Sequence, residues 1–238
     1  MSKRTISSNK AIAIFMGYTA YFYLLLLTLF PYLKLNYSAH PAVYWFITAY
    51  CLFIPLFLHA LVAVSYEGNR TWKGIQAALN IKPLTGRDWR YALGGLGLTF
   101  LFSGIIFGVS FLLNHFFDLP MLNTTPWFME MKPFQGWEKL LLLVWLPMFF
   151  FNIVGEEILW RGYIQNRLKG RYSWLLCSLL WLIFHLPFGI DLLIMLVPII
   201  LILPYSFYKT RNTTVGIFMH GIYNGPIFVA IALGIVEK

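Results

Sequence analysis

The chain has 238 residues, of which 59% are hydrophobic and only 11% are charged, and its formal net charge is +9. A typical soluble domain carries about 25% charged residues, so this composition excludes an ordinary soluble globular protein. Several apolar runs are long enough to cross a bilayer, which predicts an all-α, polytopic bundle of transmembrane helices. No Gly/Ser-rich linker interrupts the chain, so we expect one membrane domain over residues 1–238.

Seven membrane spans are expected, with six and eight as the limits of the prediction. The spans cover roughly residues 11–33, 42–64, 90–117, 138–168, 172–190, 192–208 and 213–235. With these spans, most basic residues fall in segments on the same side of the membrane as the N-terminus. The positive-inside rule therefore predicts a multi-pass protein of the cell membrane, with a cytoplasmic N-terminus and an external C-terminus.

The excess of basic residues also bears on partners. A positive charge of this size is found in nucleic-acid-binding proteins, but here the basic residues flank apolar runs instead of forming a separate polar surface. We therefore expect no nucleic-acid partner. Basic side chains at the inner face are expected to meet anionic lipid.

The third predicted span is rich in glycine. It opens with Gly94-Gly95-Leu96-Gly97, but no strand precedes this stretch, so a nucleotide-binding loop is not expected. Gly104 and Gly108 follow at a four-residue spacing. Such a pair of small residues predicts a close approach between helices.

Three of the last four spans contain polar residues in otherwise apolar sequence. They are Glu156 with Glu157, His185, His220 and Asn224. A charged side chain at the bilayer centre costs about 2.5–3.5 kcal/mol on insertion scales, so these groups must be paired, neutral or beside a polar cavity. Counting helical rise from the inner loops puts them at comparable depths, so we expect one shared cavity.

Spacing separates the roles of the two glutamates. Glu157 and Arg161 are four residues apart on one helix face, which predicts an ion pair that supports the helix end. Glu156 points about 100° away from Glu157 and lacks this partner, so we assign it to chemistry as a general base. His220 and Asn224 are also four residues apart, and together they suit an oxyanion hole.

Other uses of the same residues stay open at this stage. Zinc takes two histidines and a carboxylate in many catalytic sites, so His185, His220 and Glu156 are a possible ligand set. Against zinc, the sequence lacks the His-Glu-x-x-His arrangement, and we expect no cofactor. A proton-coupled transporter and a non-catalytic immunity or partner-binding protein are the further alternatives.

Three motifs in this order resemble a known family, the CPBP intramembrane proteases, which include CAAX prenyl endopeptidases and the Abi bacteriocin-processing or immunity proteins. The matching stretches are Glu156-Glu157-Ile158-Leu159-Trp160-Arg161, Trp181-Leu182-Ile183-Phe184-His185 and His220-Gly221-Ile222-Tyr223-Asn224. Residues 138–235 carry the resemblance as a catalytic core, and residues 1–137 are accessory spans. One departure is Trp181, where the family usually has Phe.

The resemblance implies an endopeptidase that cleaves a membrane-associated or exported peptide, and the chain looks most like a bacterial member. By the family pattern, Glu156 and His185 would activate water, while His220 and Asn224 would stabilise the oxyanion. The family has been described both as metalloproteases and as metal-free, glutamate-dependent enzymes. Our leading prediction is an intramembrane glutamate protease with a peptide or protein substrate.

Overall fold

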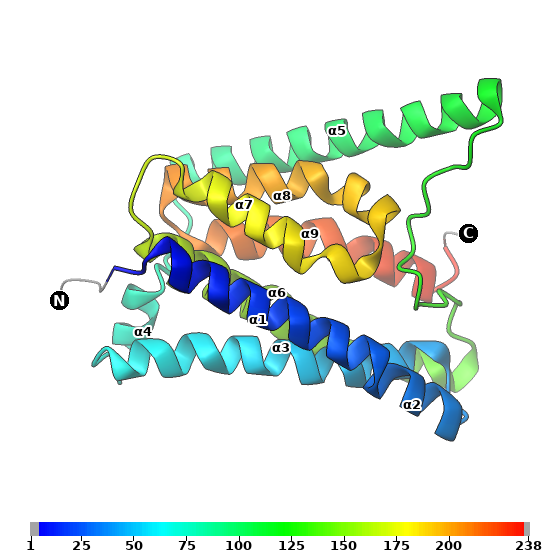
Figure 1. Cartoon of the computed structure of the whole chain (residues 1–238), viewed down its shortest axis with the longest axis horizontal. Helices are drawn as coiled ribbons and strands as arrows, with labels where there is room; N and C mark the ends of the chain where they lie inside the picture. Colours follow the sequence, from blue (N-terminus) through cyan, green and yellow to red (C-terminus); the bar gives the residue numbers. More distant parts are fainter. Residues whose placement is uncertain (1–4, 236–238) are drawn as a thin grey trace.

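The computed structural model describes residues 5–235 and is built from helices (Figure 1). In this part of the chain there are nine α-helices: α1 Ser8–Leu27, α2 Leu29–Asn36, α3 Pro41–Tyr66, α4 Trp72–Ala78, α5 Gly86–Phe117, α6 Leu141–Glu157, α7 Ser173–Phe184, α8 Ile190–Thr210 and α9 Thr213–Ala232. Single turns at Gly136–Leu140 (η1) and Leu186–Phe188 (η3) extend α6 and α7. The predicted all-α bundle is confirmed.

Six helical segments among residues 5–235 are long and apolar enough to cross a membrane, which makes the chain a multi-pass membrane protein. They are Ser8–Asn36, Pro41–Tyr66, Gly86–Phe117, Gly136–Gln165, Ile190–Thr210 and Thr213–Ala232. The fifth predicted span, 172–190, is only the short apolar segment Ser173–Phe188. Its α-helix has 12 residues and is therefore about 18 Å long, against about 30 Å for a hydrocarbon core.

A proline and a glycine end this short helix. Pro187 lies in the single turn η3, and Gly189 follows in a left-handed conformation with φ of 99°. Figure 1 shows that α7 still carries the chain back from the end where α1 begins toward the opposite end, where α9 ends. The seven predicted segments therefore still run in alternating directions, although α7 is too short to cross a hydrocarbon core.

Helix α6 occupies the middle of the bundle and changes its geometry at the predicted motif. Directly after Glu157 the helix widens into a π-helix, η2, over Ile158–Gln165, and every residue of η2 is buried. Helices α3 and α9 pack against both α6 and η2, and α7 packs against η2. Trp160 in η2 stacks on Phe15 of α1 with the ring centroids 4.0 Å apart. π-Helical turns often occur at functional sites, because they redirect side chains within a helix.

Glycines allow the closest helix contacts around this centre. A Cβ atom at Gly155 would lie 3.0 Å from the carbonyl oxygen of Phe53 in α3. A Cβ atom at Gly162 would lie 2.8 Å from the carbonyl oxygen of Leu79, at the end of α4. Backbone therefore packs directly on backbone on both sides of the buried glutamates.

Helix α5 does not use the glycine pair predicted for close packing. No atom of the described chain lies within 4 Å of the position that a Cβ atom at Gly104 or Gly108 would take. The prediction is wrong for contacts within this chain, because both glycines face outward from a helix on the edge of the bundle (Figure 1). The close contact is made instead at Gly95, where a Cβ atom would lie 2.6 Å from Met219 in α9.

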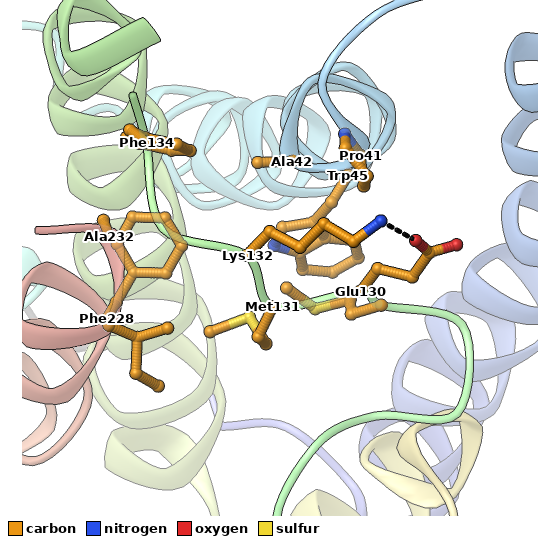
Figure 2. A pocket seen from close by; sticks show the side chains of 11 residues that line it. Pro41, Ala42, Trp45, Glu130, Met131, Lys132, Phe134, Phe228 and Ala232 are labelled. Carbon is orange, nitrogen blue, oxygen red and sulfur yellow. Dashed lines mark ion pairs between the residues drawn. The ribbon is translucent and has the colours of Figure 1, made fainter. Parts of the chain in front are cut away.

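The loop between α5 and η1 crosses the end of the bundle opposite the start of α1. Figure 2 shows part of this loop lying over α3 and α9, with the ammonium of Lys132 2.9 Å from the carboxylate of Glu130. Glu130 also pairs with Lys34 of α2 at 2.9 Å, and these two cations hold the pKa of its carboxyl down at about 2. The amide of Phe134 donates to the carbonyl of Ala232, which ties the loop to α9.

Candidate active site

A cavity of about 470 Å³ lies inside the bundle, bordered mainly by α3, α6, α8 and α9. The four residues predicted to carry the chemistry, Glu156, His185, His220 and Asn224, all line it. Thr124, Pro126 and Met129 of the loop between α5 and η1 also line the cavity. The structure therefore brings three distant sequence motifs to one cavity, as the spacing predicted.

Glu156 is held by two hydrogen-bond donors. Its Oε1 accepts a hydrogen bond from the amide of Asn152 at 2.9 Å, and its Oε2 accepts one from the indole N–H of Trp181 at 2.7 Å. Asn152 lies one turn earlier on the same helix, whereas Trp181 comes from α7. A carboxylate oxygen has two lone pairs, so each oxygen keeps one for a further donor in the cavity.

His185 has a defined tautomer. Its Nδ1 lies 2.8 Å from the backbone carbonyl of Trp181, and a carbonyl can only accept, so Nδ1 carries the proton. In the neutral ring Nε2 then has a free lone pair that can accept a proton or a hydrogen bond. The ring stands at 87° to the Trp181 indole, with the centroids 5.1 Å apart.

His220 and Glu157 form a pair that sequence spacing did not reveal. The Nδ1 of His220 lies 3.0 Å from Oε1 of Glu157, and both side chains are buried. The predicted ion pair between Glu157 and Arg161 is also present, with 3.4 Å between Oε2 and Nε. Glu157 therefore supports both the helix end and a residue of the cavity.

The guanidinium of Arg161 is wholly buried and lies face-on over the ring of Trp181, 3.7 Å from its centroid. Within the described chain none of its three nitrogens donates a hydrogen bond. Stacking on an indole and the charge of Glu157 are what compensate this cation. Arg161 thus contacts both Glu157 and Trp181, and Trp181 in turn donates to Glu156.

Asn224 completes the lining from α9. It lies one turn after His220, and its side chain makes no hydrogen bond to any other residue between 5 and 235. The amide is therefore available to donate into the cavity. Tyr223, beside it, points its hydroxyl to Ser103 of α5 at 3.2 Å and also lines the cavity.

Two contributors to the site were missed by the sequence argument. Asn152 carried a usable signal, because it lies four residues before Glu156 in the same apolar run. Trp181 was named only as part of the second motif, and its indole donor to Glu156 depends on how α7 packs against η2. Neither residue is charged, which is why a search for buried charges passed over them.

The zinc alternative does not fit this geometry. Among residues 5–235, no three His, Cys, Asp or Glu side chains are grouped so that they could hold a metal ion, and His185, His220 and Glu156 are no exception. Glu156 is held by Asn152 and Trp181, and the two histidines use their Nδ1 atoms for contacts within the chain.

Buried acid, imidazole and amide groups meeting in an apolar bundle define a polytopic membrane protein with an intramembrane polar centre of the kind that hydrolases use. Residues 138–225 match the family model described as Type II CAAX prenyl endopeptidase Rce1-like. The predicted family is thereby confirmed for the part of the chain that contains all four cavity residues. Comparisons with curated proteins and with solved structures find no match. By this description, the family is one of endopeptidases.

Proposed function

We propose that this protein is an intramembrane endopeptidase that hydrolyses a peptide bond with water activated by Glu156. The observation that carries the proposal is the common cavity lined by Glu156, His185, His220 and Asn224. The family match to endopeptidases supports the same reaction class. We place the protein in the cell membrane, with its N-terminus in the cytoplasm.

Glu156 and His185 are the groups suited to activate water. A water molecule in the cavity can donate one hydrogen to a free lone pair of Glu156 and the other to Nε2 of His185. As the water oxygen attacks the carbonyl carbon of the substrate, its proton passes to the Glu156 carboxylate. Asn152 and Trp181 hold the carboxylate in place through this step.

The tetrahedral intermediate carries an oxyanion, and donors from α9 are suited to stabilise it. Asn224 offers an amide N–H without rearrangement. His220 donates from Nε2 when its ring is doubly protonated, since Nδ1 donates to Glu157. The intermediate then collapses with cleavage of the C–N bond, and Glu156 returns its proton to the leaving nitrogen, giving a carboxylic acid and an amine.

The walls of the cavity indicate what kind of peptide it accepts. Apart from the polar residues, the lining is aromatic and aliphatic, with Phe53, Trp145, Met148 and Phe149 among its members. We infer a substrate with bulky apolar side chains near the cleaved bond, in a membrane-associated or exported peptide. An apolar wall favours such side chains because their burial releases water.

The test uses purified protein in proteoliposomes and a panel of membrane-anchored peptides, including a farnesylated CAAX peptide and an unmodified one. We expect Glu156→Gln to lower turnover by about 10²- to 10⁴-fold, the usual contribution of a general base. The matched control is Glu138→Gln in η1, outside the cavity, which should keep wild-type turnover. Full turnover by Glu156→Gln would overturn the proposal.

A non-catalytic partner-binding role predicts a different outcome. It requires that a double variant, Glu156→Gln with Asn224→Ala, keeps the cellular function while peptide cleavage is absent in the wild-type protein. Cleavage by wild-type protein, lost in His185→Ala and His220→Ala variants that still insert, supports the protease. Product masses from the same reactions identify the cleaved bond.

A further inference from the structure

Five basic side chains gather where α5 begins and α8 ends. They are Lys82, Arg87, Arg90, Lys209 and Arg211. Within the described chain none of them forms an ion pair with a carboxylate; the pairs that exist involve other cations. Asp88, the acid beside them, is buried and its carboxylate accepts hydrogen bonds from Thr85 and Asn212. This end of the bundle therefore carries an excess of positive charge.

Two of these cations lie beside a shallow depression in the surface. Arg87, Arg90 and Tyr91 are spaced at i, i+3 and i+4 on α5, so they share one helix face, and they line this depression, which has a volume of about 340 Å³. Arg87 is held in place because its Nη2 donates to the carbonyl of Lys209 at 2.9 Å. Arg90 makes no hydrogen bond or ion pair in the part of the chain that the structure describes, so its fork of donors is free.

The helix face next to these arginines is smooth and apolar. Gly94 and Gly97 follow Arg90 by four and seven residues, which places them on the same face of α5. A Cβ atom at either glycine would meet nothing within 4 Å. Leu93 and Leu101 beside them are each 57% exposed. The glycine-rich stretch of the sequence thus forms an open apolar strip directly above two arginines.

We propose that Arg87, Arg90 and Tyr91 bind the phosphate group of an anionic phospholipid, with an acyl chain lying along the strip at Gly94 and Gly97. Arginine suits this ligand because its guanidinium can give two parallel hydrogen bonds to phosphate oxygens. The position also suits it, since the inner leaflet is anionic and α5 lies on the edge of the bundle (Figure 1). Only 17% of the most apolar window of α5 is buried, the lowest share among the six spans. This inference does not depend on protease activity.

The experiment measures lipid binding to the full chain in an uncharged detergent by native mass spectrometry. Dioctanoyl phosphatidylglycerol is the probe, with dioctanoyl phosphatidylcholine and inorganic phosphate as separate arms. We expect phosphatidylglycerol to bind the wild-type protein more tightly than phosphatidylcholine. The double variant Arg87→Gln, Arg90→Gln should bind it about 20- to 30-fold more weakly, since each basic residue near an anionic headgroup is worth about a fivefold change in affinity.

Two controls keep the result specific. Arg70→Gln with Lys73→Gln removes the same charge from the exposed start of α4 and should leave the affinity unchanged. Arg90→Gln alone, which breaks no contact within the described chain, should lose about fivefold and covers the case in which the double variant loosens α5. Equal losses in the two double variants, equal binding of the two lipids, or competition by inorganic phosphate as strong as by phosphatidylglycerol would each overturn the proposal.

Discussion

The indole N–H of Trp181 donates to the Glu156 carboxylate at 2.7 Å, which links two helices at the centre of the cavity. Removing this donor should weaken catalysis and leave substrate binding unchanged. We expect Trp181→Phe to lower kcat about tenfold or more, because a hydrogen bond to a charged group is worth about 1.5–3 kcal/mol, while KM stays near the wild-type value.

Trp174→Phe is the matched control for this variant. Trp174 lies on the same helix but packs on Tyr205, away from the cavity, so kcat should not change. Steady-state kinetics in proteoliposomes give both constants. An unchanged kcat in Trp181→Phe would show that Asn152 alone is enough to position Glu156, and the positioning role of the indole would be abandoned.

The buried pair of Arg161 and Glu157 makes a prediction about stability. Arg161→Met leaves the buried Glu157 with His220 as its remaining side-chain partner among residues 5–235, so we expect a loss of about 3 kcal/mol or more in the free energy of unfolding. The double variant Arg161→Met, Glu157→Gln removes both charges and should recover part of this loss. Unfolding in mixed micelles measures the difference.

Arg171→Met serves as the reference for that experiment, because Arg171 is exposed at the end of the bundle where η2 ends. It should change the free energy of unfolding by no more than a few tenths of a kcal/mol, about the size of ordinary surface substitutions. If Arg161→Met were as mild as Arg171→Met, the buried ion pair would contribute nothing and the stacking on Trp181 would have to be dispensable as well.

Spacing along the chain predicted which residues line the cavity. It did not predict all of the contacts between their side chains. His220 and Asn224 line one cavity because i and i+4 positions share a helix face, and that rule needs only the sequence. The pair of His220 and Glu157 joins residues 63 positions apart, and nothing local in either helix specifies it. The π-helix after Glu157 also lacks a local signal such as proline, since it depends on how η2 packs against its neighbours.

The glycines illustrate the same limit. Gly104 and Gly108 have the spacing of a helix-packing motif but face away from the bundle, whereas Gly155 and Gly162, which no spacing rule singled out, make the tight contacts. Which face of an apolar helix points inward cannot be read from its periodicity when all faces are apolar. The short fifth span was overestimated for a related reason, because apolar residues continue beyond the point where Pro187 and Gly189 end α7.

Two glycine substitutions should therefore behave in opposite ways. Gly162→Ala places a methyl group 2.8 Å from a backbone carbonyl oxygen, which cannot move aside easily, so we expect a marked loss of stability of about 1–3 kcal/mol, as found for overpacked sites. Gly104→Ala adds a methyl group in open space and should be neutral or stabilising by up to about 1 kcal/mol, because alanine favours helix. Thermal unfolding of both variants in one detergent compares them directly.

Removal of metal provides the last prediction. No three His, Cys, Asp or Glu side chains are grouped for a metal ion among residues 5–235. We expect peptide cleavage to be unaffected by EDTA or 1,10-phenanthroline, and unchanged when zinc is added back. The control is Glu156→Gln, which should remain inactive with and without zinc. Loss of wild-type activity on chelation, restored by zinc, would show that the reaction depends on a metal ion, and water activation would then have to be assigned to that ion instead of Glu156 alone.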